Sequence, residues 1–225
     1  MMFRKKLLFA VTLLSLCLPP LSALANPFSC LQLPVKGEAA KYLHDLQLCN
    51  TAESPADDDT RVLAVDKDKV LISLGLGETL TKTISLQPHS DSHEFKVEQS
   101  FETSLTIMNE GPHMDLLDWQ HHIGDWAELP RKNAVTFLAH EVNNATFPAV
   151  TTEEIVAAVA EESAKWAKGG YDPGELWIIA ARNCKAPDSY PCGVSVSKVF
   201  FRILVKAAGQ WQQIQLIEVK IPMGC

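Results

Sequence analysis

Apolar and polar side chains alternate most regularly between Glu94 and Ile107. Every even position carries a charged or hydroxyl side chain, and the apolar residues fall on the odd positions Phe95, Val97, Phe101, Leu105 and Ile107. A period of two is the spacing of a β-strand, whose alternate side chains lie on opposite faces. We therefore expect a long strand with one buried and one solvated face in an antiparallel sheet, and its length leaves room for a bend or bulge near 99–100.

Shorter apolar or alternating runs, separated by turn residues, predict further strands. Two pairs of them form hairpins, one around the charged turn at 66–69 and one around the turn at 207–210. The run 176–181 is apolar on both faces, which is typical of a central strand covered by a helix. These predicted strands cover 62–65, 70–74, 80–86, 176–181, 199–205 and 211–221.

Two segments have helical spacing instead. Thr151 and Glu154 form a capping box, in which each side chain bonds a free amide of the first turn, and the helix that begins there runs to about Lys168. Its inward stripe consists of Ile155, Val156, Val159, Ser163 and Trp166. A short amphipathic helix is predicted at 37–48, where one face carries Ala39, Ala40, Leu43 and Leu46.

Together these elements predict an α+β fold. Its largely antiparallel sheet is covered by the short N-terminal helix and by the longer helix at 152–168. The chain of 225 residues is 47% hydrophobic, which argues against disorder. We expect one domain at 26–225, because about 200 residues suffice for a single well-buried core.

The first 25 residues have the order of a secretory signal peptide. Arg4, Lys5 and Lys6 precede an apolar run, and Ala23-Leu24-Ala25 supplies a small-residue cleavage site before Asn26. The apolar run of about 12 residues is shorter than the about 20 that a membrane span needs. We therefore expect a cleaved leader, no membrane span in the mature chain, and a periplasmic or secreted protein.

Acidic residues outnumber basic residues by 27 to 20. Because the leader carries three of the basic residues, the mature chain is more acidic still. Nucleic acid and anionic membranes are therefore poor candidate partners, and a basic exported protein fits the sign of the charge better. Solubility outside the cell explains the same excess of acid without any partner.

Five cysteines follow the leader, and an oxidising compartment favours disulfides between them. We expect Cys30 to pair with Cys49, and Cys184 to pair with Cys192 across a short loop that contains proline. Cys225 is then left over, as a free thiol, as a link to another chain, or as the true partner of Cys184 or Cys192.

The densest polar chemistry lies at 110–126. Imidazole and carboxylate are the usual ligands of a hydrolytic metal ion, and this stretch offers His113, Asp118, His121 and His122. One hypothesis is therefore a metal-dependent hydrolase with zinc or another divalent ion, in which Asp115 or Asp125 orients a histidine or acts as the general base. The spacing matches no zinc signature, and a structural surface loop, whose tryptophans pack on the sheet, is the plainer explanation of the cluster.

A second hypothesis uses the same stretch for recognition. Trp119 and Trp126 would be aromatic anchors, while Asp115, Asp118 and Asp125 would meet a basic partner at the rim of the interface. Core packing explains the two tryptophans about as well.

Known catalytic motifs are incomplete in this sequence. His140-Glu141 begins like a zinc-protease helix, but the second histidine is replaced by Asn144. Gly193 and Ser195 lack the second glycine of a nucleophile elbow. The sequence therefore favours a protein-binding domain without a cofactor over an enzyme, for instance an inhibitor or immunity-type protein that acts on another exported protein. A structural or assembly factor of the envelope is a third hypothesis.

Overall fold

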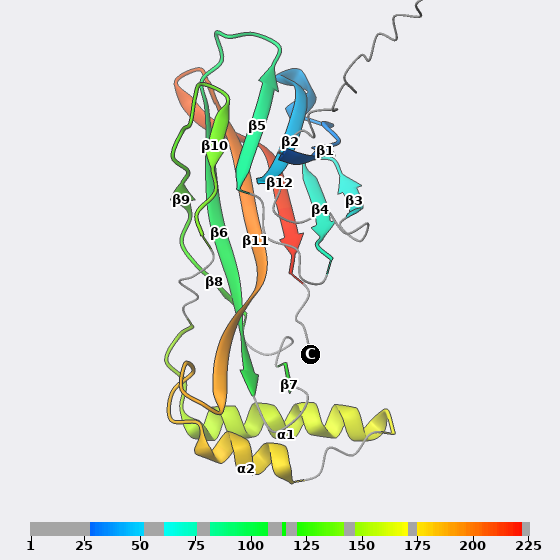
Figure 1. Ribbon diagram of the computed structural model, residues 1–225, viewed down its shortest axis with the longest axis vertical. Helices are drawn as coiled ribbons and strands as arrows, with labels where there is room; N and C mark the ends of the chain where they lie inside the picture. The colour runs from blue at the N-terminus through cyan, green and yellow to red at the C-terminus, as the bar shows by residue number, and fades with distance from the viewer. Residues whose placement is uncertain are drawn as a thin grey trace, which may run out of the picture.

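The computed structural model describes residues 28–51, 61–75, 82–107, 114–115, 121–141, 147–170 and 175–221. Two β-sheets and two α-helices dominate this part of the chain (Figure 1). The smaller sheet has the strand order β1 (Phe28–Leu33), β2 (Leu43–Thr51), β5 (Thr83–Pro88) and β10 (Thr136–Leu138). The larger sheet has the order β3 (Arg61–Asp66), β4 (Lys69–Ser73), β12 (Gln210–Lys220), β11 (Cys192–Ala207), β6 (Phe95–Ile107) and β7 (Met114–Asp115), with β8 (His122–Ile123) and β9 (Ala127–Glu128) also paired to β6.

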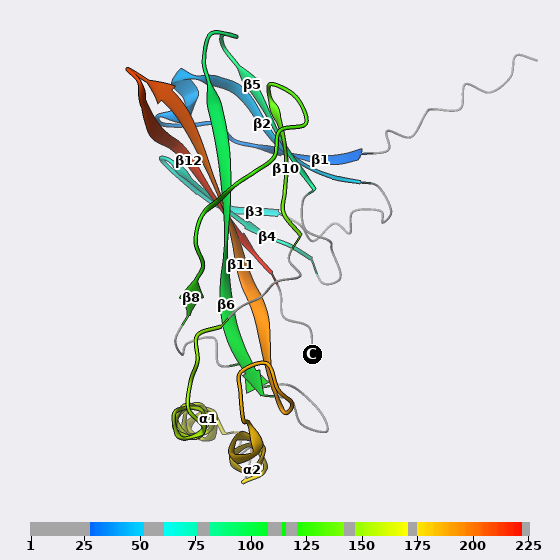
Figure 2. The ribbon, with the colours of Figure 1, turned by 90° about the vertical axis from the view of Figure 1, so that its left-hand side faces the viewer.

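The antiparallel pair β6 and β11 forms the long axis of the molecule. Its ladder runs from the pair Phe95 and Val205 to the pair Ile107 and Cys192, whereas β12 accompanies β11 only from Lys198 onward. The far half of the ladder therefore extends beyond the packed sheets. At its end α1 (Thr152–Lys168) and α2 (Leu176–Asn183) lie side by side, as Figures 1 and 2 show.

Two separate hydrophobic clusters stabilise the sheet part and the helical end of the molecule. The first lies between the two sheets, and its members with an exposed fraction of 0–2% include Phe201, Phe137, Leu33, Leu43, Leu46, Ile72, Ile84 and Leu129. The second joins the helices to the far ends of β6 and β11, through Leu105, Ile107, Ile155, Val159, Trp177 and Ala181. The sheets and the helical end thus each have their own core.

Helix α1 confirms the sequence prediction. Its N-cap residue, Thr151, accepts a hydrogen bond at Oγ1 from the amide of Glu154 (3.2 Å), and the Thr151 amide donates to Oε2 of Glu154 (2.8 Å). The predicted capping box is therefore complete. Ile155 and Val159 lie on the buried face, as the apolar stripe indicates.

Three predicted strand regions are also confirmed. The hairpins around 66–69 and 207–210 are β3–β4 and β11–β12, and the alternating segment from 94 to 107 is β6. The irregularity in the long ladder is not near 99–100 of β6. It lies on β11 between Val196 and Lys198, where Ser197 is the extra residue. The strand predicted at 80–86 corresponds to β5, which belongs to the smaller sheet.

The predicted α+β fold class is wrong, because the chain is mostly β-sheet and has two sheets instead of one. The helix at 152–168 does not cover a sheet face; it lies at the end of the β6–β11 ladder beside α2 (Figure 2). A central strand at 176–181 is likewise wrong, because this run forms α2. Its residues Trp177, Ala180 and Ala181 have the i, i+3, i+4 spacing of a helix and are buried, and alanine favours a helix over a strand.

The short N-terminal helix predicted at 37–48 is also wrong. Only Ala39–Lys41 forms a single 3-10 turn, η1, and the chain then continues as β2. Strand β2 pairs with β1 on one side and β5 on the other. Hydrogen bonds on both sides, together with the disulfide at Cys49, outweigh the helical spacing of a few apolar residues.

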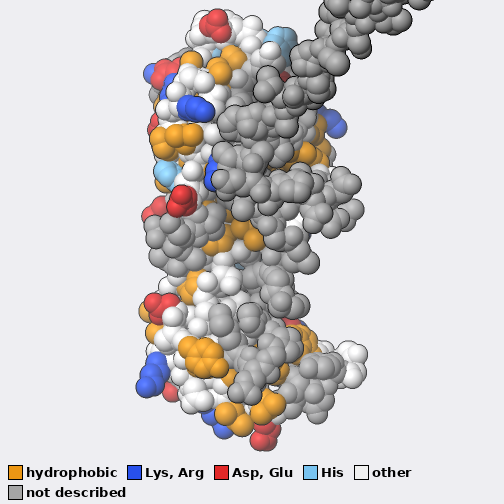
Figure 3. Space-filling model, viewed as in Figure 1, with side chains coloured by type: hydrophobic (Ala, Val, Ile, Leu, Met, Phe, Trp, Pro, Cys, Tyr) orange, Lys and Arg blue, Asp and Glu red, His pale blue; other side chains and the backbone are white. Residues whose placement is uncertain are grey.

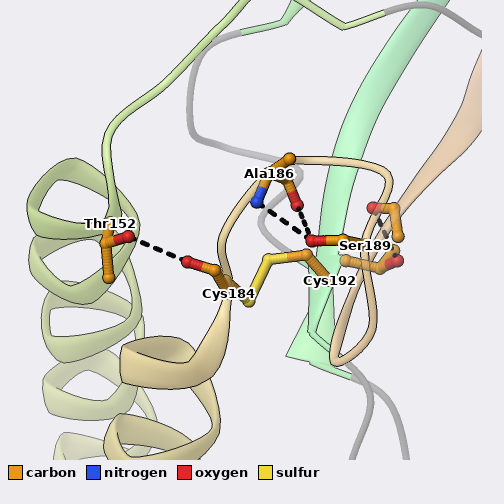
Figure 4. The surroundings of a disulfide bond; sticks show 7 residues. Thr152, Cys184, Ala186, Ser189 and Cys192 are labelled. Carbon is orange, nitrogen blue, oxygen red and sulfur yellow. Dashed lines mark hydrogen bonds between the residues drawn. A yellow bond between two sulfur atoms is a disulfide. The ribbon is translucent and has the colours of Figure 1, made fainter.

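Both disulfides named from the sequence are present, Cys30–Cys49 and Cys184–Cys192. The first joins directly paired positions of β1 and β2. The second closes the loop from α2 to β11, and the Thr152 hydroxyl at the start of α1 donates to the carbonyl of Cys184 (2.8 Å; Figure 4). The proposed leader at 1–25 and Cys225 lie outside the described residues. Among the described helices, none is long and apolar enough to cross a membrane.

Candidate functional site

The polar face of β6 is buried, contrary to the solvated face expected from the sequence. Its residues are only 0–7% exposed: Glu98, Ser100, Glu102, Ser104 and Thr106. Buried carboxylates cost free energy unless they are paired and hydrogen-bonded. The partners of these two glutamates therefore define the strongest cluster of chemistry in the described part of the chain.

A row of alternating charges, which we call the charged ladder, crosses four strands of the larger sheet. It consists of Lys69 on β4, Glu218 on β12, Lys198 on β11, Glu102 on β6, and His121, which precedes β8. Nζ of Lys198 lies 3.1 Å from Oε1 of Glu102 and 3.9 Å from Oε1 of Glu218, and Nζ of Lys69 lies 2.5 Å from Oε2 of Glu218. Glu218 thereby lies between two lysines on neighbouring strands, and Glu102 lies between Lys198 and the imidazole of His121.

A second group surrounds Glu98. Lys96 approaches its Oε1 atom at 2.7 Å, and Nε of Arg202 donates to its Oε2 atom. The guanidinium of Arg202 lies 4.4 Å from the centre of the Trp126 ring, and that ring also packs against Phe200. The half-buried ring of Trp126 therefore covers Arg202 through a cation–π contact.

The groups around Glu98 and Glu102, the two buried glutamates of β6, favour the ionised form of each side chain. Burial by itself raises the pKa of Glu102, but hydrogen bonds from Lys198, His121 and Ser197 outweigh it and hold the pKa below its ordinary value of 4.5. Burial also opposes ionisation of Glu98, and the hydrogen bonds from Lys96 and Arg202 lower its pKa in the same way. Both side chains are therefore carboxylates at neutral pH.

Acid is expected to weaken the fold through these two groups. Their contribution to stability is fully present above the unfolded pKa of about 4.3 and is lost as the pH falls through the lowered folded values. We expect a smaller free energy of unfolding at pH 3 than at pH 7 in urea titrations, and a weaker pH dependence in the double variant Glu98→Gln, Glu102→Gln. The control is Glu94→Gln, whose ion pair with Lys206 is exposed. A double variant that retains the full pH dependence contradicts this assignment.

The pair Glu102 and His121 resembles half of an acid–base site. Nδ1 of His121 lies 2.8 Å from Oε1 of Glu102, so that a proton on Nδ1 leaves Nε2 as an acceptor. The nearby Ser197 hydroxyl donates to the same carboxylate oxygen at 2.9 Å. Between the described residues, no hydrogen bond joins this hydroxyl to the imidazole of His121. The observed bonds thus position a histidine but provide no activated nucleophile.

The residues predicted for metal binding and recognition are only partly described. His113, Asp118 and Trp119 lie outside the described residues, and the side chain of Asp115 on β7 does as well. Asp125 is exposed and His122 is half-buried. The structure brings His121 to Glu102, and Trp126 to Arg202. No group of three or more histidine, cysteine or carboxylate side chains with metal-binding geometry occurs among the described residues.

Sequence reasoning missed Glu98, Glu102, Lys198 and Arg202. The sequence carries one signal for these residues, which is the spacing of the charges on β6 and β11, the two strands that pair. Glutamates recur four residues apart on β6, and cations recur four residues apart on β11, with Lys206 as the third. In an antiparallel pair these steps place opposite charges next to each other on one face.

Apolar side chains are exposed at the helical end. The exposed fraction is 63% for Leu176 and 49% for Ile179, both on α2, and 74% for Tyr190 in the loop that Cys184–Cys192 closes. Apolar side chains gather over this end in the space-filling view (Figure 3). Exposed charges of both signs lie on the two helices: Glu153, Glu161, Lys165 and Lys168 on α1, and Glu175 and Arg182 at the two ends of α2.

Comparison with known proteins gives no assignment for either surface. No family model, no curated protein and no solved structure matches the chain. The function is therefore inferred from the chemistry and exposure of the residues themselves.

Proposed function

We propose that this chain is an exported domain that binds another exported protein through the outer face of α2. The observation that carries the proposal is the exposure of Leu176 and Ile179. They lie on one side of the helix, while Trp177, Ala180 and Ala181 on the other side fill the second core. Apolar side chains that stay exposed to water on a short helix cost free energy. Burial against a partner surface removes that cost.

Export is supported by the leader pattern at 1–25 and by the two disulfides. A basic and apolar start followed by a small-residue site is typical of secretory signals. Disulfides are stable in oxidising compartments such as the periplasm or the extracellular medium.

The proposed binding face is held rigidly. Helix α2 packs on α1 through Trp177 and Trp166, whose ring centres are 6.4 Å apart, and its last turn is tied to β11 by the disulfide. Ordering a surface before it meets its partner reduces the entropy cost of binding.

The proposal can be tested with a photo-crosslinking residue placed at Ile179 or, as a control, at Leu63. Leu63 is similarly exposed, at 48%, but lies on β3 in the sheet part of the molecule, away from the two helices (Figure 1). We expect a single protein adduct in the producing cell from position 179 and none from position 63. The crosslinked protein, once purified, should then bind the unaltered chain directly.

The direct binding assay decides the role of α2. The variant Ile179→Glu is expected to weaken affinity by about ten-fold or more, since it places a charge in an apolar contact. The thermal midpoint should stay within about 2 °C, because the residue is exposed. Unchanged affinity in Ile179→Glu, or equal adducts from both positions, would rule out α2 as the binding face.

A further inference from the structure

Two histidines that belong neither to the charged ladder nor to α2 meet in the smaller sheet. His44 belongs to β2, and His89 directly follows β5, its antiparallel neighbour. The register of this pair shifts between Leu43 and Asp45, so that His44 stands at a bulge next to the end of β5. Nδ1 of His89 lies 2.8 Å from Nε2 of His44, and both residues are exposed. Strands β2 and β5 lie at the end of the molecule opposite the two helices (Figure 1).

The hydrogen bonds of His89 fix which of its nitrogens carries a proton. Nε2 of His89 lies 3.0 Å from the carbonyl oxygen of Ala40 in η1. A carbonyl only accepts, so Nε2 is the donor, and the neutral ring presents a lone pair at Nδ1. The backbone is held as well, because the His89 amide donates to the carbonyl of Tyr42 at 2.9 Å. An imidazole whose second nitrogen donates to a backbone carbonyl is the usual arrangement of a metal ligand.

We propose that His44 and His89 together bind one divalent transition-metal ion, with Cu²⁺ preferred. Metal–nitrogen bonds of about 2.0–2.1 Å at right angles place two ligand nitrogens about 2.8–3.0 Å apart. The observed separation of 2.8 Å already matches two adjacent ligands of this geometry. Without metal, Nε2 of His44 donates to Nδ1 of His89, so metal binding moves the His44 proton to Nδ1 of its own ring and frees the Nε2 lone pair for the ion.

The choice of metal follows from the ligands. Imidazole nitrogen suits Cu²⁺, Ni²⁺ and Zn²⁺, right-angled coordination is typical of Cu²⁺ and Ni²⁺, and Cu²⁺ binds most tightly in this series. No third metal-ligating side chain joins this pair among the described residues, so water completes the coordination. The ion links β2, the end of β5 and, through Ala40, η1, and it therefore stabilises the sheet end when bound.

The test uses the full mature chain, purified without a histidine tag and with its disulfides intact, and Cu²⁺ as the probe. We expect one Cu²⁺ per chain at pH 7.5 by calorimetry, with two nitrogen ligands in the electron paramagnetic resonance spectrum. His44→Gln and His89→Gln should each weaken affinity by about ten-fold or more. They should also remove the rise in thermal midpoint that Cu²⁺ produces, while the midpoint without metal changes little, because both side chains are exposed.

A matched control separates this site from the other histidines. The double variant His121→Gln, His122→Gln leaves the pair intact and should bind Cu²⁺ with unchanged affinity and stoichiometry. Binding that survives in His44→Gln and His89→Gln, or that disappears in the control variant, overturns the proposal. So does the absence of any Cu²⁺ binding by the unaltered chain. None of these outcomes bears on α2, so the metal site and the proposed function stand or fall separately.

Discussion

Replacing Phe201 with alanine is expected to lower the free energy of unfolding by about 3–5 kcal/mol. Phe201 lies in the middle of β11, has an exposed fraction of 0%, and packs in the cluster between the two sheets. Removing the ring loses its transfer free energy and leaves a cavity that paired strands on both sides prevent from closing. Urea unfolding at pH 7, with the disulfides intact, measures the loss.

The variant Leu63→Ala is the control for this prediction. It also shortens an apolar side chain of the larger sheet, but Leu63 is 48% exposed, so the expected change is within about 0.5 kcal/mol. A loss of less than about 1.5 kcal/mol in Phe201→Ala would mean that the two sheets are not packed on each other through this residue.

The parts of the fold that sequence reasoning predicted correctly are those in which local and tertiary forces agree. The alternation in β6 and β11 matches strands whose odd-numbered apolar side chains fill the core between the sheets and, at the far end of β6, the core of the helical end. The capping box at Thr151 is satisfied entirely within the first turn of α1, so its partners can be identified without knowing the fold.

The wrong predictions concern short segments. At 37–48 the apolar spacing fits a helix, but β1 and β5 supply hydrogen bonds along both edges of β2. At 176–181 the apolar run fits either a strand or a helix, and length alone does not distinguish them. Contacts of Trp177 and Ala181 with α1 and the end of β6 select the helix. Both outcomes depend on neighbours that are distant in sequence.

The candidate site shows the same limit in its charges. A charged or hydroxyl side chain at every second position of β6 indicates solvent, and Glu98 and Glu102 are nevertheless buried. They are buried because Lys198 and Arg202 on β11 lie next to them, and because Trp126 covers the arginine. The residue types were readable from the sequence, whereas their pairing required the register of two strands about a hundred positions apart.

Replacing Trp177 with alanine is expected to unfold the helical end while the two sheets stay folded. Trp177 is 5% exposed, contacts Trp166 edge-on, and belongs to the cluster formed by α1, α2 and the far ends of β6 and β11. Loss of the Trp177 side chain costs about 3–5 kcal/mol. This is a large part of the free energy by which so small a core stabilises the helical end. Because the cluster between the sheets shares none of these residues, local unfolding has no reason to spread.

Circular dichroism at 222 nm during heating is expected to show an early transition in Trp177→Ala that the unaltered chain lacks. Hydrogen exchange should locate it, with amides of α1 and α2 losing protection while those of β11 and β12 near Phe201 retain it. Leu176→Ala is the control, because this neighbour on the same helix is 63% exposed and should change stability by about 0.5 kcal/mol or less. A single transition that lowers protection equally in the sheets and the helices would show that the two clusters unfold as one unit. If the early transition is found, Trp177→Ala should also lose binding through α2, since the exposed face of Leu176 and Ile179 exists only while the helix is folded.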